Sequence, residues 1–246
     1  MNTIGWLGAA GSLLVLMACG GGGDLLGESG GAGSAGPAVQ IRGVVARGGA
    51  LVEAKVTARC AAGPAVSAIS GSSGAYAMEV GEDALPCVLE AVSADGAWRL
   101  HSVVPAPEEA SPSAAARPRT AHITPLTELL VAQLAGVAPS SFMVKASTRA
   151  LGATITPTNI TQAHGAVGRV LQLMGVNPAP ITDVLAQPLV AASAVQRGNA
   201  HDKVLAALAA AMEGAGAKMS DLVGLVTSRA RTLDQTSRAS AAQRSG

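Results

Sequence analysis

The sequence is poor in aromatic and charged residues. Aromatic side chains make up 2% of the 246 residues, charged side chains make up 13%, and the formal net charge is +1. So few aromatic rings leave little surface on which bases or sugars could stack, and a nearly neutral chain creates no field that attracts nucleic acid. The composition therefore predicts no nucleic-acid partner. Hydrophobic residues nevertheless reach 49%, which excludes a disordered chain of the highly charged kind.

Motifs for catalysis and cofactor binding are also missing. Gly27–Gly31 matches Gly-x-Ser-x-Gly of a serine hydrolase, but it lies in a glycine-rich segment and not at the strand-to-helix turn that the nucleophile needs. Gly31–Gly36 matches Gly-x-Gly-x-x-Gly, but a glycine-rich segment precedes it and Pro37 follows it, whereas a dinucleotide site needs a strand before and a helix after. The histidines lack the spacing of a metal site; they are His101, His122, His164 and His201. We therefore predict no enzyme activity, with no catalytic residue, no cofactor and no metal.

An apolar, uncharged run stands near the N-terminus. Ile4–Met17 has 14 residues, fewer than the ~20 that a membrane-spanning helix needs, and its length suits the hydrophobic region of a secretory signal peptide. The run ends in Leu16-Met17-Ala18-Cys19-Gly20. This ending resembles the lipobox of bacterial lipoproteins, so residues 1–18 are expected to be the signal peptide.

The lipobox resemblance implies a membrane anchor at Cys19. The chain would be cut before Cys19, which would then carry acyl chains such as palmitate on its thiol and its new amino group. Two or more acyl chains hold a protein stably on a membrane. Glycine rather than aspartate after the cysteine implies the outer membrane, with the protein facing the periplasm. An ordinary cleaved signal peptide, in which Cys19 has no role, is the alternative.

Two segments with different patterns follow the signal peptide. Residues 19–37 are rich in glycine, serine and alanine and predict a flexible tether. Residues 38–104 alternate between apolar and polar side chains and are interrupted by glycine, which is typical of short antiparallel strands in a small β-sandwich. The strands are expected at residues 39–45, 52–60, 66–69, 76–80, 87–92 and 98–104.

Glycine-containing segments of residues 38–104 carry a second resemblance. The segments are Gly43-Val44-Val45, Gly49–Val56 and Ser73–Met78. They resemble a carboxypeptidase regulatory-like domain, which has the transthyretin (prealbumin) fold. Such domains are non-catalytic accessory modules of secreted proteins. The resemblance therefore implies a transthyretin-like sandwich without chemistry of its own.

Cys60 and Cys87 are the cysteines that remain beside Cys19. A signal peptide delivers them to an oxidising compartment, where disulfides persist. A bridge between them would close a loop of 27 residues and stabilise the fold by about 3–4 kcal/mol in the loop-entropy model. We predict this disulfide. Two free buried thiols or a metal site are the alternatives, although no Cys-x-x-Cys or neighbouring histidine supports a metal.

The hydrophobic period changes after residues 105–120, which are rich in proline and predict a linker. Apolar residues then recur with helical spacing, and His201-Asp202 is interpreted as a capping pair at a helix start. We expect a helical domain over residues 121–231 and a disordered tail over residues 232–246. The first helix is expected to begin at Thr124-Pro125, with a capping residue and a proline in its first turn, and to end at Gly136. A second is expected from Ser140 to Leu151, and others are expected to begin near residues 158, 202 and 221, with a short one at 182–186.

Ile123–Thr127 and His201–Leu208 resemble the helical second half of bacterial lipoproteins that begin with a transthyretin-like domain. The whole chain is thus predicted to be an α+β multidomain protein, with a small antiparallel sandwich followed by an all-α domain. Its expected role is non-catalytic binding or scaffolding in the cell envelope, with an unidentified envelope protein as partner. The alternatives are a hydrolase or accessory subunit acting on envelope glycan or peptide, and a carrier with an apolar cavity of a few hundred Å³ for a small ligand.

Overall fold

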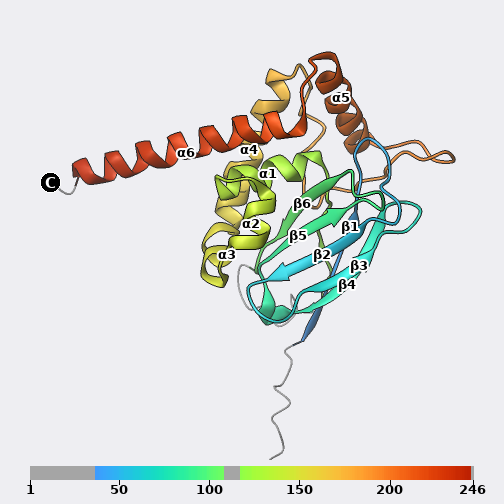
Figure 1. The fold of residues 1–246 in the computed structure, drawn as a ribbon, viewed down its shortest axis with the longest axis horizontal. Coiled ribbons are helices and arrows are strands. Elements are labelled where there is room, and N and C mark those ends of the chain that lie inside the picture. The colour runs from blue at the N-terminus through green and yellow to red at the C-terminus, as the bar shows by residue number, and fades with distance from the viewer. Residues whose placement is uncertain (1–36, 108–116, 245–246) are drawn as a thin grey trace, which may run out of the picture. The chain divides into compact units, whose positions relative to one another are not determined.

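Seven strands form two sheets, in the orders β4-β1-β7 and β3-β2-β5-β6 (Figure 1). The computed structural model describes residues 37–107 and 117–244. Cys19, the predicted signal peptide and nearly all of the predicted tether lie outside these residues. The strands are β1 (Ala38–Val44), β2 (Lys55–Cys60), β3 (Val66–Ile69), β4 (Ala75–Gly81), β5 (Cys87–Val92), β6 (Arg99–Val104) and β7 (Arg119–Thr120).

The six strands expected from the sequence are present, and the pairings among these six are antiparallel. The alternation in β2 has the predicted effect, because Val56, Ala58 and Cys60 are buried whereas Lys55 is exposed. The short strand β7 lies at the end of the segment predicted as a linker and pairs in parallel with β1, with Ile41 opposite Arg119. The chain therefore returns to its first strand before the helices begin.

Two glycines of the segments that carry the domain resemblance stand where a side chain would not fit. A Cβ atom on Gly43 would collide with the backbone carbonyl of Ala121, just after β7. Gly74 has φ +75°, and a Cβ atom there would collide with the carbonyl oxygen of Val45. Glycine is required at Gly43 by the close approach of the backbone, and at Gly74 by both the close approach and the positive φ.

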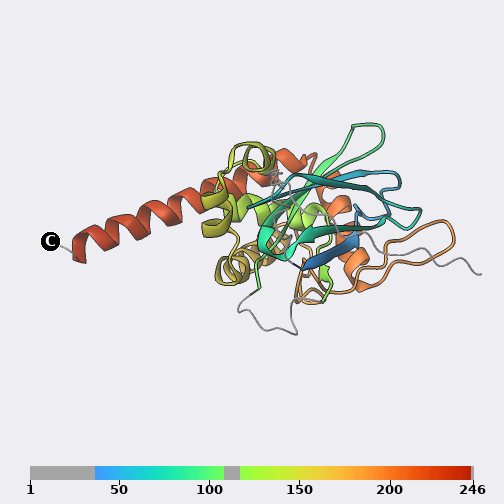
Figure 2. The same ribbon diagram turned by 90° about the horizontal axis from the view of Figure 1, so that it is seen from below.

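Strands β5 and β6 are buried on both faces. Cys87, Leu89 and Leu100 belong to an apolar cluster enclosed by the two sheets, whereas Val88 and Val103 belong to the cluster formed with the helices. Side chains alternate between the two faces of a strand, so one residue in two on these strands points to the helices. The helices cover this outer face, as Figure 2 shows for the yellow-green segments beside the strands.

Six α-helices follow the strands in the described residues. Helix α1 is buried from Pro125 to Ala132 on all sides and packs against β6, α2, α4 and α6. It begins with the predicted cap, since Thr124 and Thr127 form a reciprocal capping box, and it ends at Gly136 in the left-handed conformation. The helices are α1 (Pro125–Ala135), α2 (Pro139–Lys145), α3 (Thr148–Thr154), α4 (Pro157–Leu173), α5 (Ala200–Gly214) and α6 (Met219–Arg244).

The helical boundaries differ from the predicted ones in two places. The single helix expected from Ser140 to Leu151 is two helices, because Ala146 is extended and the Ser147 hydroxyl caps α3 by accepting a hydrogen bond from the Ala150 N–H. The short helix expected at 182–186 is a turn. There the Asp183 carboxylate accepts hydrogen bonds from the next backbone N–H groups, an arrangement that competes with a helix.

The C-terminal segment also differs from its prediction. The sequence predicted a disordered tail from residue 232, but α6 continues as helical backbone to Arg244 (Figure 1). Residues 232–244 contain no glycine or proline, and alanine, arginine and glutamine favour helix. Together, the two mainly antiparallel sheets and six helices confirm the predicted α+β class.

Candidate functional site

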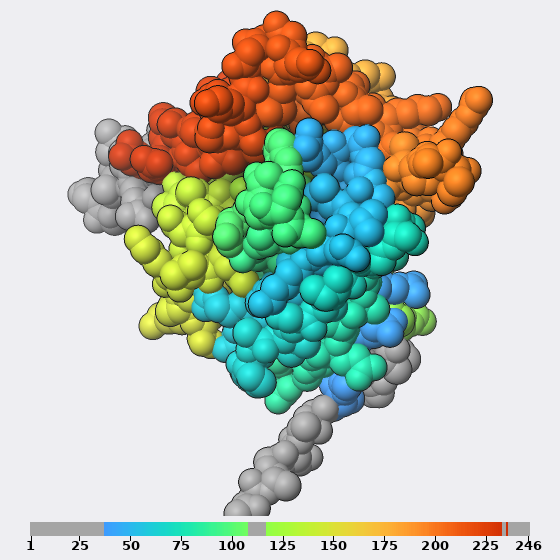
Figure 3. Space-filling model, turned by 45° about the vertical axis from the view of Figure 1, so that its right-hand side comes forward, coloured from blue at the N-terminus to red at the C-terminus, as the bar shows by residue number. Residues whose placement is uncertain are grey.

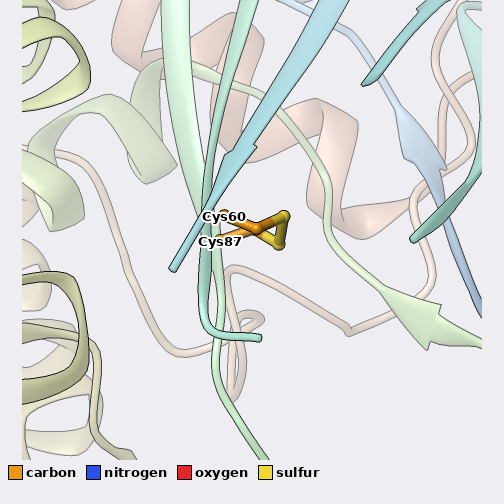
Figure 4. The surroundings of a disulfide bond; sticks show 2 residues. All are labelled: Cys60 and Cys87. Carbon is orange, nitrogen blue, oxygen red and sulfur yellow. A yellow bond between two sulfur atoms is a disulfide. The ribbon is translucent and has the colours of Figure 1, made fainter. Parts of the chain in front are cut away.

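The Cys60–Cys87 disulfide is present at the paired ends of two strands (Figure 4). Cys60 is the last residue of β2 and Cys87 the first of β5, and the two face each other in the antiparallel register. Both are buried between the sheets. The antiparallel pairing of β2 and β5 thus explains why residues 27 positions apart are brought together, and the predicted pairing agrees with the structure.

The first cluster of ionisable groups is centred on His101, which is 1% exposed. Its Nδ1 atom lies 2.8 Å from Oε2 of Glu128, and the same oxygen accepts a hydrogen bond of 2.7 Å from the His101 backbone N–H. Its Nε2 atom lies 3.3 Å from Oε2 of Glu90, which also forms an ion pair with Arg99. The Nδ1 atom of His101 therefore has a carboxylate as its hydrogen-bond partner, whereas the Nε2 atom lies near the Glu90 carboxylate without a hydrogen bond in the described residues.

Strand pairing and helix capping place these groups. Glu90 and His101 stand opposite each other on β5 and β6, on the face that is covered by α1. The capping-box residue Thr127 donates a hydrogen bond of 2.7 Å to the His101 carbonyl, and Glu128 follows it in the first turn of α1. The Glu90–His101–Glu128 cluster therefore fixes α1 on the sheet. Because the His101 ring is enclosed, a substrate in solution cannot reach it.

A second cluster brings together His122 and His201, whose rings meet edge to face with centroids 5.8 Å apart. Both side chains are buried. The Nδ1 atom of His122 accepts a hydrogen bond of 3.1 Å from the Val44 N–H, and Nδ1 of His201 lies 3.4 Å from the Gln187 carbonyl oxygen. The Nε2 atoms of both rings lack a hydrogen-bond partner in the described part of the chain.

Burial sets the ionisation of this histidine pair. It lowers the pKa of His122 to about 4, with the neighbouring His201 as the second cause, while the Gln187 carbonyl and Asp183 oppose the shift. Burial likewise lowers the pKa of His201, against the raising effects of Gln187, Asp183 and Asp202. The bond from the Val44 N–H adds a reason for a neutral His122, because a protonated Nδ1 could not accept it.

The interpretation of His201-Asp202 as a capping pair is only half right. Asp202 does lie in the first turn of α5, where a negative charge suits the helix dipole, but the cap is Asn199. The Asp202 carboxylate instead accepts a hydrogen bond of 3.1 Å from the Ala192 N–H. Asp202 thus fastens the segment before α5, whose Ala192 carbonyl accepts a hydrogen bond from the Ala50 N–H. Figure 3 shows this orange part of the chain beside the blue N-terminal part of the fold.

A cavity of about 550 Å³ lies where the end of β6, β7, α1, the start of α4 and residues 182–186 meet. Ile160 and His164 face it from α4, four residues apart and so on one side of that helix. The apolar part of the cavity wall is formed by Leu130, Val184 and Leu185. A concave site with apolar walls and few polar groups is the usual form of a small-molecule site, and its size matches the cavity expected for a carrier.

The polar groups of the cavity include one guanidinium and one carboxylate. Arg119, half-buried on β7, has Nε and Nη2 atoms that are buried and without a hydrogen-bond partner among the described residues. Asp183 is already engaged, because its Oδ1 accepts hydrogen bonds from Leu185 (2.8 Å) and Ala186 (3.1 Å). No ion pair joins Arg119 to Asp183 in the residues that the structure covers.

A metal-binding cluster and a single membrane-spanning helix are both absent from the described residues 37–107 and 117–244. No group of three or more histidine, cysteine, aspartate or glutamate side chains there could hold a metal ion. No single helix there is long and apolar enough to cross a membrane, and only the pair α1 and α2, bent by 61°, meets that length and composition test jointly.

Comparison with known proteins finds no matching family model and no matching curated protein. The resemblances to lipoproteins and to carboxypeptidase regulatory-like domains therefore rest on the quoted residues and remain predictions. The support for a function therefore comes from the arrangement of the side chains.

Sequence reasoning missed both histidine clusters and the cavity arginine. His122 and His201 are 79 positions apart in the sequence, and Arg119 lay in a presumed linker. One signal was available, because Glu128 is a charged residue inside an otherwise apolar helix, and buried charges are usually paired. Its partner could not be inferred, since nothing in the sequence places α1 over β6.

Proposed function

We propose that the chain is a lipoprotein of the bacterial outer membrane, facing the periplasm, whose folded part has a non-catalytic binding role. The observation that carries this proposal is the sequence Leu16-Met17-Ala18-Cys19-Gly20 at the end of an uncharged apolar run. In this proposal Cys19 is lipidated after cleavage, and residues 20–37 link it to β1. A flexible linker of that length has a root-mean-square span of roughly 20–25 Å.

The proposal includes a transthyretin-like fold for the sheets. Support comes from the two sheets around one apolar cluster and from Gly43 and Gly74, which lie in the segments that resemble a carboxypeptidase regulatory-like domain. The Cys60–Cys87 disulfide fits an exported protein, because disulfides persist in oxidising compartments.

The arrangement of ionisable groups favours binding over catalysis. His101 is enclosed by two glutamates, and His122 and His201 are buried. A general base must reach the proton that it removes, directly or through one water. These three histidines are instead placed where they hold segments of the fold together. An envelope protein remains the proposed partner of the binding role.

A second candidate function is the carriage of a small molecule, which the cavity of about 550 Å³ beside α4 favours. The hydrolase alternative has no comparable support. Carriage and lipid anchoring are compatible, since the anchor is at Cys19 and the cavity is lined by residues from Val104 onward.

Labelling with radioactive palmitate in a Gram-negative host tests the anchor. The wild-type chain is expected to incorporate label and to fractionate with outer membranes, whereas Cys19→Ser should do neither, because the thiol that accepts the lipid is gone. Cys60→Ser serves as the matched control and should retain label. Equal labelling of wild type and Cys19→Ser would refute the anchor, and wild-type protein without label would refute it as well.

A further inference from the structure

We infer that the cavity beside α4 binds an amphipathic carboxylate whose charged group is held by Arg119. This inference deepens the small-ligand function proposed above by assigning the ligand's chemical class and its charged anchor. The Nε and Nη2 atoms of Arg119 are buried and have no acceptor in the described residues. A buried charge without a partner is costly, so an acceptor is expected to bind there.

The pair of unpartnered atoms indicates the shape of that acceptor. The N–H groups of Nε and Nη2 project from the same edge of the planar guanidinium, and this edge matches the two oxygens of a carboxylate in a bidentate arrangement. Arg119 lines the cavity, and because its Nε and Nη2 atoms are buried, the inferred binding requires a rotation of the side chain that brings this edge to the open volume. An alcohol or an amide could satisfy only part of the edge.

The rest of the wall indicates an apolar tail on the ligand. Leu130 and Val184 are buried and Ile160 is half-buried. They line the cavity together with three prolines, which follow β6 (Pro105), precede β7 (Pro118) and begin α4 (Pro157). Burial of an alkyl chain against such a wall is favourable by its area. Asp183 lines the same cavity, but its Oδ1 atom already accepts hydrogen bonds from two backbone N–H groups. This oxygen therefore does not compete with a ligand carboxylate for Arg119.

The cavity is also the meeting point of separate parts of the chain. Arg119 comes from the strand that pairs with β1, Leu130 from the central helix, and Ile160 from α4. A ligand that touches all three would link the sheets to the helices. It would therefore raise the stability of the whole folded unit, because a ligand that binds only the folded state shifts unfolding to higher denaturant concentration.

The test uses octanoate and 1-octanol, which share an alkyl chain and differ in the charged group. The full chain carrying Cys19→Ser is titrated with each by ligand-observed NMR, so lipidation plays no part in the result. Octanoate is expected to bind about tenfold or more tightly than 1-octanol, as charge-assisted bidentate bonding implies. Arg119→Gln should weaken octanoate by about tenfold and 1-octanol by less than about twofold.

Matched variants separate charge, cavity and folding. Arg149→Gln, an exposed arginine on α3, should leave both affinities unchanged. Arg119→Lys should bind octanoate with intermediate strength, because it keeps the charge and loses the planar fork. Thr161→Trp, an exposed residue at the cavity wall, should weaken both ligands by filling the volume, and it does not depend on whether the Arg119 variants fold.

The outcomes distinguish the binding of a carboxylate by Arg119 from small-molecule binding in general, on which it depends. If octanoate and 1-octanol bind equally, and Thr161→Trp weakens both, the carboxylate assignment is overturned while small-molecule binding stands. If neither ligand binds, both are overturned. Octanoate binding that survives Arg119→Gln without loss overturns Arg119 as the anchor.

Discussion

His101 and the pair His122–His201 are buried to a similar degree, yet their surroundings are opposite. Carboxylates face both ring nitrogens of His101, whereas the described residues place no carboxylate within ion-pair distance of His122 or His201. The second site disfavours a positive ring, because burial lowers the pKa of both of its histidines. Burial of a histidine therefore does not by itself tell whether acidic side chains surround its ring.

The largest effect is expected from removing the shared acceptor of the first site. Glu128→Ala leaves the His101 backbone N–H and its ring Nδ1 buried without a partner and should lower the free energy of unfolding by about 3–5 kcal/mol. The urea midpoint at pH 7 measures this loss. Glu213→Ala, on the exposed side of α5, is the control. A loss below 1 kcal/mol for Glu128→Ala would show that the cluster does not hold α1 on the sheet.

An intermediate effect is expected from pH at the second site. Unfolded histidine takes up a proton near pH 6.5, whereas burial delays the protonation of folded His122 until about pH 4. Acid therefore favours the unfolded state, and stability due to His122 should fall by about 2 kcal/mol as the pH drops from 7 to 5. Urea midpoints across this range measure the slope.

Variants identify the histidine that causes this pH dependence. His122→Asn keeps an acceptor near the position of Nδ1 for the Val44 N–H. It should reduce the slope between pH 7 and 5, because it removes one of the two buried rings whose pKa is lowered, and His201 accounts for the slope that is left. His164→Gln, a half-exposed position on α4, should leave the slope unchanged. An unaltered slope in His122→Asn would exclude His122 as its origin.

The smallest effect is expected at the outer carboxylate of the first site. Glu90 is partly exposed, and its ion pair with Arg99 involves a side chain that is 52% exposed, so solvent weakens both interactions. Glu90→Gln retains an acceptor for His101 and should cost less than about 1 kcal/mol in the urea midpoint at pH 7. A cost equal to that of Glu128→Ala would mean that the two carboxylates contribute equally to the burial of His101.

The elements of this fold were easier to predict than the sites. Alternation and glycine located the strands, and Thr124-Pro125 with Gly136 located α1, because these signals act over a few neighbouring residues. The disulfide followed from counting cysteines. The histidine sites depend on contacts between distant segments, such as Val44 with His122, and no local pattern records them.

The parallel pairing of β7 with β1 has a mechanical consequence. β1 is the central strand of its sheet, flanked by β4 and β7, and it is the first element of the described fold. Any tension applied through the N-terminal segment reaches the fold at Ala38 and is shared by two neighbours at once. If that tension runs along the strand, the hydrogen bonds of β1 must shear together rather than unzip singly. A pull on the N-terminal segment would thus act on a strand that is paired on both sides.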